Sequence, residues 1–441
     1  MGRLLRFTVF LAAILGAHAA PSEAELQKYW AQWRGPLASG VAPKANPPTS
    51  WSETKNIRWK IELPGKGHSS PIVFGDRIFV MGATPVGDSR PPVFDDAPGT
   101  HDNVGVTRTN QFWVMAIDRR TGKSLWKKVV AEEFPHEGGH ITGSLVNHSP
   151  VTDGENVYAL FGSHGLFCFD LDGELKWQKK LGRMDTLHAH GEGSSPAVHG
   201  DSLIVCWDHE GDSFLYSFDK RTGQERWKTA RDEKTAWATP LVVQNGDKWQ
   251  IVTSATKRVR GYDFDTGALI WECAGLARNV VASPVAADGI VFAGNSYDFA
   301  AMLAIRLAGA KGDITHTTNV LWKLNRLTPY VPSPLLYEDL YFLRHNQNVL
   351  SRVDPATGRL RGEPIRLEGI RDFIFSSPVA AAKRIYITSR DGVTVVLSQD
   401  EKNTQLAINH LDDVFSASAA LVDGDLILRG ERFLYCVSEV N

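Results

Sequence analysis

The side chains best suited to chemistry in this sequence stand just before a series of short apolar segments. They combine imidazoles, carboxylates, cations and aromatic rings, which together can bind a small ligand, a metal ion or part of a partner. Because these positions are far apart in the chain, a shared site requires a fold that brings the segments together. The candidate binding residues are His68, His148, His190, Glu192, Trp237, Arg278, Tyr330 and Asp372.

Two histidine-rich stretches stand out. His188 and His190 with Glu192 have the composition of a metal site, although their spacing alone does not fix a coordination geometry. His136 and His140 lie in a Gly-rich loop, where single histidines often bond only to backbone groups. No metal site and no catalytic residue is therefore predicted.

Four further positions have a structural explanation as well as a functional one. Arg278 and Asp372, with Asp413, could pair with one another across a channel instead of binding a ligand. Trp237 could stack on a planar ligand or plug the channel, and the plug is the favoured interpretation. The sequence contains no nucleophile elbow, phosphate-binding loop, zincin motif or dinucleotide-binding fingerprint.

The elements that must position these residues recur along the chain as one repeat. A Ser-Pro or Thr-Pro step followed by an apolar strand marks each copy, and most copies start about 44 residues after the preceding one. A second strand follows, a third runs into Asp-x-x-Thr-Gly, and a fourth usually ends in Trp. The steps are Ser70-Pro71, Ser149-Pro150, Ser195-Pro196, Thr239-Pro240, Ser283-Pro284, Ser333-Pro334 and Ser377-Pro378, with a degenerate copy at Ser418-Ala419.

Four short strands in each of eight repeats predict an all-β fold, an eight-bladed β-propeller of four-stranded antiparallel blades. The last repeat lacks a fourth strand, and the orphan segment 57–63 can supply it, so that an N-terminal strand closes the ring in the last blade. Each Asp-x-x-Thr-Gly step predicts a hairpin turn, and the strand-ending tryptophan is expected to pack against a neighbouring blade. These tryptophans are Trp59, Trp126, Trp177, Trp227, Trp271 and Trp322.

The domain boundaries follow from the repeat. Residues 50–441 are predicted to form a single propeller, preceded by an N-terminal extension over 21–49. An insertion at 84–110 separates the second and third strands of the first blade, on the face that carries the candidate residues. It is either a lid or partner-binding segment, or a disordered excursion. A smaller insertion at 308–318 is expected on the opposite face.

Residues 1–20 have the pattern of a cleavable signal peptide. Arg3 and Arg6 precede an apolar run over 7–15, and Ala17-His18-Ala19 matches the small-residue cleavage pattern. No cysteine follows for lipidation, and no other segment is long and apolar enough to span a bilayer. We therefore expect a periplasmic or secreted protein, and a closed ring of this kind is expected to be monomeric.

Composition excludes two classes of protein. Lys+Arg 48 against Asp+Glu 50 leaves a net charge of −2, which argues against a strongly basic nucleic-acid-binding protein. The four cysteines are scattered, with no C-x-x-C spacing and no adjacent pair. Buried free thiols are expected, and a covalently attached c-type haem is excluded.

The repeat resembles that of the pyrroloquinoline-quinone (PQQ) type propellers, whose blades carry the motif A-x-D-x-x-T-G-x-x-x-W. Residues 116–126 match it in full. The segment 29–36 is similar to the W-x-Q-W-R-G-P opening of a BamB-like, PQQ-like subfamily of exported bacterial proteins, and so is the segment 63–71. The resemblance covers residues 50–441 and implies the propeller fold.

The resemblance implies two different functions. Quinoprotein alcohol dehydrogenases hold PQQ and a metal ion at the propeller axis, whereas BamB-type subunits are non-enzymatic scaffolds in outer-membrane protein assembly. The dehydrogenases characteristically carry an adjacent Cys-Cys disulfide over the cofactor, and this chain has no such pair. We therefore expect an exported binding or assembly scaffold, without a cofactor, that takes an envelope protein or a small molecule at its axial face. The alternative is a quinoprotein oxidoreductase with PQQ and a divalent cation such as Ca²⁺, and a carbohydrate-binding module is a third option.

Overall fold

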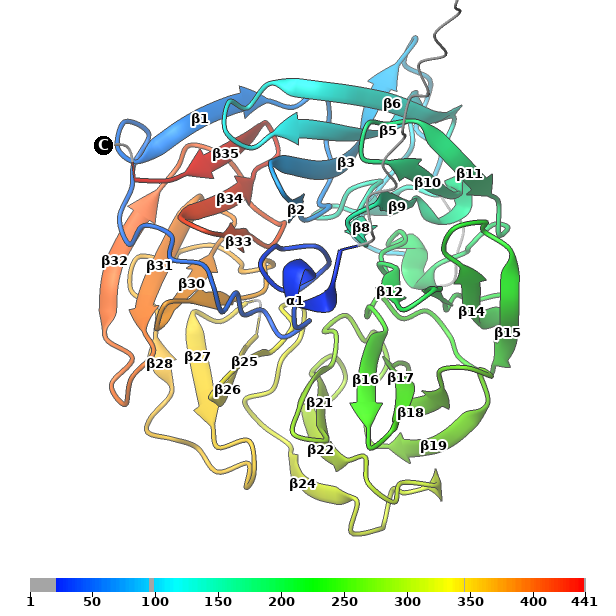
Figure 1. Ribbon diagram of the computed structural model, residues 1–441, viewed down its shortest axis with the longest axis vertical. Coiled ribbons are helices and arrows are strands. Elements are labelled where there is room, and N and C mark those ends of the chain that lie inside the picture. Colours follow the sequence, from blue (N-terminus) through cyan, green and yellow to red (C-terminus); the bar gives the residue numbers. More distant parts are fainter. Residues whose placement is uncertain (1–20, 95–98, 345, 440–441) are drawn as a thin grey trace, which may run out of the picture.

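The chain forms a ring of β-sheets around a central axis (Figure 1). The structure is a computed structural model that describes residues 21–94, 99–344 and 346–439. Within these ranges there are eight blades, each an antiparallel sheet of at least four strands. The prediction of an all-β, eight-bladed propeller is thus confirmed. The expected signal peptide, residues 1–20, lies outside the described residues, and no described helix is long and apolar enough to cross a membrane.

Each blade runs from an inner strand at the axis to an outer strand at the rim. Blades one to four consist of β2 (Ile72–Phe74), β3 (Arg77–Val86), β5 (Thr109–Asp118) and β6 (Ser124–Glu133); β8 (Val151–Thr152), β9 (Asn156–Leu160), β10 (Leu166–Asp170) and β11 (Leu175–Lys179); β12 (Ala197–His199), β13 (Ser202–Trp207), β14 (Ser213–Asp219) and β15 (Glu225–Arg231); β16 (Leu241–Asn245), β17 (Lys248–Ser254), β18 (Arg258–Asp263) and β19 (Leu269–Ala274).

The second half of the ring repeats this order. Blades five to eight consist of β20 (Val285–Ala287), β21 (Ile290–Asn295), β22 (Ala301–Arg306) and β24 (Val320–Leu324); β25 (Leu335–Tyr337), β26 (Asp339–Leu343), β27 (Val349–Val353) and β28 (Ile365–Arg366); β29 (Val379–Ala381), β30 (Arg384–Thr388), β31 (Val393–Ser398) and β32 (Gln405–His410); β33 (Ala420–Val422), β34 (Asp425–Arg429), β35 (Phe433–Val437) and β1 (Ile57–Glu62).

The serines and the threonine of the Ser/Thr-Pro steps form a closed circle of hydrogen bonds at the axis. The backbone N–H of each step residue donates to the side-chain hydroxyl of the step residue in the next blade, at 2.8–3.1 Å. The circle runs through Ser70, Ser149, Ser195, Thr239, Ser283, Ser333, Ser377 and Ser418, and returns to Ser70. We call these eight residues the hydroxyl circle. Because every bond joins two blades, the circle fixes the angular position of all eight inner strands.

The strand-ending tryptophans tie the blades together at larger radius. The Trp126 indole N–H donates to the Leu171 carbonyl oxygen of the next blade at 2.9 Å, and its ring lies where a Cβ on Gly173 would be. Trp59, Trp177, Trp227 and Trp322 repeat this contact. Trp271 differs, since its indole N–H donates to Gln250 of its own blade.

The exception at Trp271 has a cause in the next blade. Blade five has the insertion 308–318 in place of the Asp-x-x-Thr-Gly turn, so the usual acceptor is missing. Within that insertion β23 (Gly312–Asp313) pairs in parallel with β19 of blade four. Trp271 still belongs to an apolar cluster shared by blades four and five, which includes Leu307 and Ile314.

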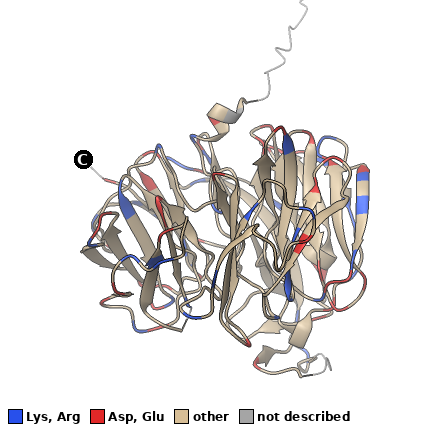
Figure 2. Cartoon of the chain, turned by 90° about the horizontal axis from the view of Figure 1, so that it is seen from below, with Lys and Arg blue, Asp and Glu red and all other residues tan. Residues whose placement is uncertain are grey.

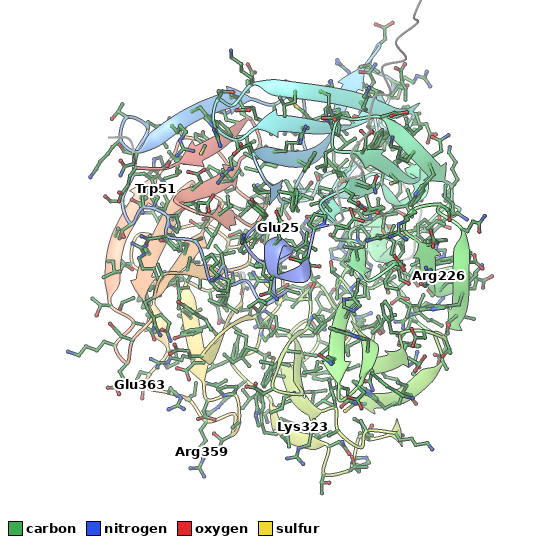
Figure 3. All side chains as sticks on the ribbon, in the orientation of Figure 1. Glu25, Trp51, Arg226, Lys323, Arg359 and Glu363 are labelled. Carbon is green, nitrogen blue, oxygen red and sulfur yellow. The ribbon has the colours of Figure 1, made fainter. Side chains whose placement is uncertain are left out.

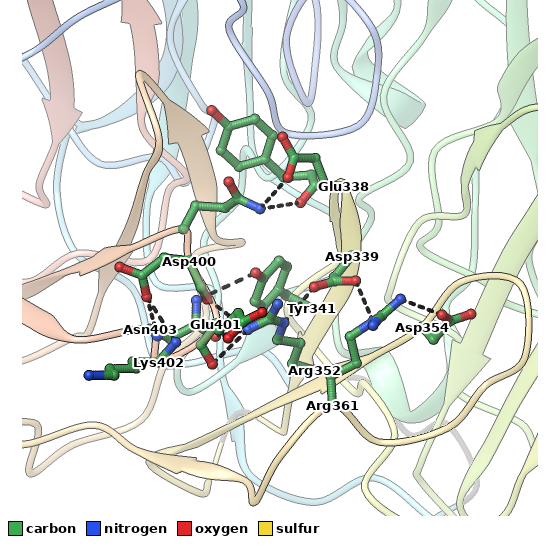
Figure 4. Close-up of polar contacts among 12 residues, drawn as sticks. Glu338, Asp339, Tyr341, Arg352, Asp354, Arg361, Asp400, Glu401, Lys402 and Asn403 are labelled. Carbon is green, nitrogen blue, oxygen red and sulfur yellow. Dashed lines mark hydrogen bonds and ion pairs between the residues drawn. The ribbon is translucent and has the colours of Figure 1, made fainter.

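A guanidinium replaces the tryptophan between blades six and seven, because β28 ends without one (Figure 4). Arg352 on β27 pairs with Asp339 at 2.5 Å in its own blade and donates to the Asp400 carbonyl oxygen of blade seven at 2.7 Å. It also donates to the Asn403 side-chain oxygen at 3.0 Å. Arg361 reaches the same Asp339 from the exposed side, at 2.9 Å.

Blade eight contains both an N-terminal and a C-terminal strand. β1 pairs antiparallel with β35, with Lys60 opposite Tyr435. Arg58 on β1 forms an ion pair with Asp425 at 2.9 Å, and Arg119 of blade one pairs with Asp423 at 2.9 Å. No exposed sheet edge is therefore left where the ring starts and ends.

The extension 21–49 lies across one end of the axis, with α1 (Glu23–Leu26) standing on that face (Figures 1 and 2). Its carbonyl oxygens accept backbone N–H groups of inner strands, as in the bonds from Val73 to Trp30 and from Ala380 to Gly40. The buried Arg34 guanidinium donates to the carbonyl oxygens of Pro334 and Pro378, at 2.6 and 2.7 Å. The extension thus covers the end of the channel opposite to the loops that lead into the inner strands.

Removing one hydroxyl of the circle is expected to destabilise the whole ring. Ser195→Ala leaves the buried Ser149 N–H without its acceptor, which costs roughly 1–3 kcal/mol of unfolding free energy. Ser195→Thr is the matched control, because Thr239 fills the equivalent position in blade four. Urea unfolding followed by tryptophan fluorescence measures both variants. Equal stability of Ser195→Ala and wild type would contradict the importance of the circle.

Arg352→Ala is expected to weaken the contact between blades six and seven. It leaves the nearly buried Asp339 without its closest cation, and breaking such a pair costs roughly 3 kcal/mol. Arg361→Ala removes the half-exposed partner of the same carboxylate and should cost at most about 1 kcal/mol. Thermal unfolding of the two variants tests this order, and a larger loss from Arg361→Ala would contradict it.

Candidate functional site

A cavity of about 540 Å³ lies at the axis, between the hydroxyl circle and the loops that lead into the inner strands. Seven of the eight circle residues line it, and Trp33 of the extension lines its far end, with the indole N–H 3.3 Å from the Ser283 hydroxyl oxygen. Histidine and aromatic side chains form its walls. The extension therefore lies over the far end of the cavity.

The structure brings four of the eight candidate residues into this cavity. His68, His190, Trp237 and Tyr330 line it, and each is half-buried. The Trp237 indole N–H donates to the Gly191 carbonyl oxygen at 2.6 Å, which fixes the ring at the wall. A ligand that enters the cavity would therefore meet a rigid indole rather than a mobile plug.

The other four candidates do not line the cavity. His148 is buried, and its Nδ1 has no hydrogen-bond partner among the described residues. The Glu192 carboxylate accepts hydrogen bonds from the Ser163 N–H and hydroxyl, in space that Gly162 leaves open by lacking a Cβ. Arg278 is exposed and pairs with Asp298 at 3.1 Å, and Asp372 is exposed. None of the described ion pairs joins Arg278, Asp372 and Asp413 to one another across the axis.

Four imidazoles gather at one side of the mouth. The His190 ring lies 4.7 Å from His140 and 4.9 Å from His101, and His188 lies 4.7 Å from His101, all between ring centroids. His101 belongs to the insertion 84–110, whose described part also pairs with the neighbouring loop through β4 (Asn103–Val104) and β7 (Gly139–His140). The described part of the insertion is therefore bonded to the mouth of the cavity.

Three histidines of the cavity, His68, His140 and His190, are neutral near pH 7. Burial lowers the pKa of His68 to about 3, helped by the nearby Arg429 and Arg390 charges. Burial and the adjacent imidazoles lower the pKa of His190 to about 4, and burial also lowers the pKa of His140. These three imidazoles therefore add polarity to the cavity but no charge.

One cluster has ligand atoms close enough for a metal ion, away from the cavity lining. His136, Glu137 and Asp185 lie within 4.8 Å of one another. The Glu137 carboxylate already accepts hydrogen bonds from Thr186 and Gly191, and His136 Nε2 bonds the Met184 carbonyl oxygen at 2.8 Å. His136 and Glu137 are therefore engaged with the protein, and the exposed Asp185 pairs with Arg183 at 2.9 Å.

The sequence analysis missed several cavity residues because it considered only the loops before the inner strands. Tyr297 and Arg344 lie in connections between second and third strands, which reach the same face. Phe375 lies three residues after the candidate Asp372, in the loop before the inner strand of blade seven. The placement of the insertion 84–110 in such a connection was the one signal that could have drawn attention to them.

Comparisons with known proteins identify the family. The family model described as "Outer membrane protein assembly factor BamB" matches residues 48–207 and 211–438. The chain belongs to this PQQ-like propeller family. The resemblance noted in the sequence is thereby confirmed. A comparison with proteins of curated function finds no match.

Solved structures of this family's fold include both enzymes and an assembly factor. A europium-containing methanol dehydrogenase matches with a TM-score of 0.64 and 10% identity, over 93% of this chain and 92% of that one. BamB from Moraxella catarrhalis matches with a TM-score of 0.52 and 15% identity, over 81% and 98%. A quinohemoprotein alcohol dehydrogenase from Pseudomonas putida HK5 matches with a TM-score of 0.54 and 10% identity, over 95% and 81%. At these identities the likeness shows the fold alone.

The Glu192 carboxyl is expected to make stability depend on pH. Burial raises its pKa to about 7, so the folded chain holds this proton where the unfolded chain has released it. The stability that the proton provides is present at low pH and is lost as the pH rises through 7. Relative to Glu192→Gln, the wild type should lose about 1–2 kcal/mol between pH 5 and pH 8.

Denaturant unfolding of both proteins at the two pH values measures this difference. Glu225→Gln, on the exposed side of β15, is the matched control and should follow the wild type. A stability difference between wild type and Glu192→Gln that is the same at both pH values would show that the carboxyl is already ionised at pH 5.

Proposed function

We propose that this protein is an exported, non-enzymatic binding or assembly scaffold whose working surface is the axial face. The observation that supports this most strongly is the lining of the cavity, which contains no carboxylate among the described residues. Its polar groups are imidazoles, hydroxyls and amides, with Arg344 as the cation. Such a lining favours recognition by stacking and hydrogen bonds over metal-assisted chemistry.

A quinone cofactor with a divalent cation does not fit this donor set. Calcium and similar hard cations prefer carboxylate oxygens. Four carboxylates close in sequence to lining residues are engaged or exposed: Glu192 bonds Ser163, Asp298 pairs with Arg278, and Asp102 and Asp372 are exposed. We therefore derive no redox step at this cavity.

The proposed location is the periplasm or the exterior of the cell. The signal-peptide pattern of residues 1–20 supports export, and so does membership in a family described by an outer-membrane assembly factor. The proposed partner is an envelope protein or a small molecule that enters the axial mouth, and the protein acts as a monomer.

A titration with PQQ, with and without Ca²⁺, tests the proposal against its alternative. We expect no saturable change in PQQ absorbance or in the midpoint of thermal unfolding of the mature protein at a large excess of PQQ. Titrations with La³⁺ in place of Ca²⁺ should give the same result. Saturable, cation-dependent binding at micromolar PQQ would contradict the scaffold proposal and favour a quinoprotein oxidoreductase.

A further inference from the structure

Arg344 lies at the wall of the cavity, and none of the described carboxylates pairs with it. It follows β26 and donates through Nη2 to the Ser296 carbonyl oxygen of blade five at 3.1 Å. Its Nε is buried and has no hydrogen-bond partner in the described parts of the chain. Most other arginines of this ring are paired, as Arg352 is with Asp339. Because the Arg344 side chain lines the cavity and pairs with no described carboxylate, an anionic group that enters the cavity can form a charge-assisted hydrogen bond with it.

Aromatic rings and a second unpaired polar atom surround this cation. Tyr297 and Tyr330 lie 5.8 Å apart between ring centroids, and Phe375 and Trp237 line the same cavity. Asn279 also lines it, and its buried Oδ1 has no partner among the residues described. Together these groups match a ligand with one aromatic ring, one anionic group and one N–H donor.

The shape of the cavity decides what kind of chain could enter. Trp33 and the extension cover the far end of the axis, so a polypeptide cannot thread through the ring. Only the end of a chain or a single side chain can be accommodated. A carboxyl terminus combines a chain end with an anion, and its last residue brings both a side chain and a backbone N–H.

The rim of the mouth is apolar at three places. Phe299, Phe373 and Ile141 are 54%, 43% and 65% exposed. Each lies within two residues of a position that lines the cavity, namely Tyr297, Phe375 and His140 or Thr142. Exposed apolar groups around a polar pocket are typical of surfaces that bind another protein. The rim therefore favours a polypeptide over a small free ligand.

We propose that the axial cavity binds the carboxyl terminus of a partner polypeptide that ends in an aromatic residue. The Arg344 guanidinium pairs with the terminal carboxylate, the aromatic walls take the last side chain, and the rim contacts the preceding residues. This inference rests on the proposed scaffold function and names the chemistry of its partner.

Calorimetry with a defined peptide pair tests the proposal on the mature full-length protein. The probes are Ac-Gly-Ser-Gly-Ser-Phe with a free carboxyl terminus and the same peptide as its C-terminal amide. We expect the acid to bind at least tenfold more tightly than the amide. Arg344→Gln should weaken binding of the acid at least tenfold and remove the difference between the two peptides, and Arg344→Lys should restore part of it.

Two controls separate the outcomes. Arg359→Gln changes an exposed arginine at the outer perimeter of the same blade (Figure 3) and should bind like the wild type. The thermal midpoint of each variant shows that it is folded. Equal binding of acid and amide, or no binding of either by folded wild type, would overturn the inference. N-acetylphenylalanine that binds as tightly as the peptide would overturn the polypeptide assignment in favour of a small aromatic acid.

The experiments distinguish failure of the peptide-binding proposal from failure of the scaffold proposal. Absence of peptide binding leaves the scaffold proposal standing if PQQ also fails to bind. Cation-dependent PQQ binding contradicts the scaffold proposal whatever the peptides do.

Discussion

A circle of eight hydrogen bonds at the axis, from backbone N–H to hydroxyl, is the interaction on which the rest of the structure depends. Each bond joins one blade to the next, and each lies at the position just before an inner strand. Proline follows in seven of the eight blades, and it holds the preceding residue extended and has no N–H of its own. Blade eight has Ala419 instead and still keeps the bonds of Ser418. The hydroxyl is therefore the part of the step that all eight blades share. With the inner strands fixed, the loops that lead into them must converge on one face.

Much of this was predictable from the sequence because each blade repeats the same local chemistry. The Ser/Thr-Pro steps and the Asp-x-x-Thr-Gly turns predicted the strands, and the number of steps predicted eight blades. The circle itself was not predictable, since a Ser-Pro step shows a local turn preference but not a partner some 44 residues away. The absence of a hydrogen bond from the Trp271 indole to the next blade was not predictable for a similar reason. Its cause lies in the insertion of the next blade.

The site was harder to predict than the fold. His68, His190, Trp237 and Tyr330 reach the cavity because they lie in the loops that the circle draws together. Arg278 and Asp372 lie in equivalent loops but point to solvent, and loop position alone does not decide the direction of a side chain. Arg344 comes from the connection between the second and third strands of blade six, so no pattern in the loops before the inner strands could reveal it.

The chemistry of the cavity distinguishes this chain within a fold that serves both assembly and catalysis. Imidazoles, aromatic walls and the Arg344 guanidinium can recognise a partner, but the described lining offers no carboxylate to a hard cation. The extension lies over the far end of this cavity.

Hydrogen–deuterium exchange of the mature protein, with and without the phenylalanine-terminated peptide acid, tests most directly the claim that the axial cavity is the binding site. The account predicts slower exchange in segments that line or border the mouth, among them 139–143, 190–193, 296–299, 330–331 and 371–377. Protection confined to the outer strands or to the extension would place binding elsewhere and contradict it.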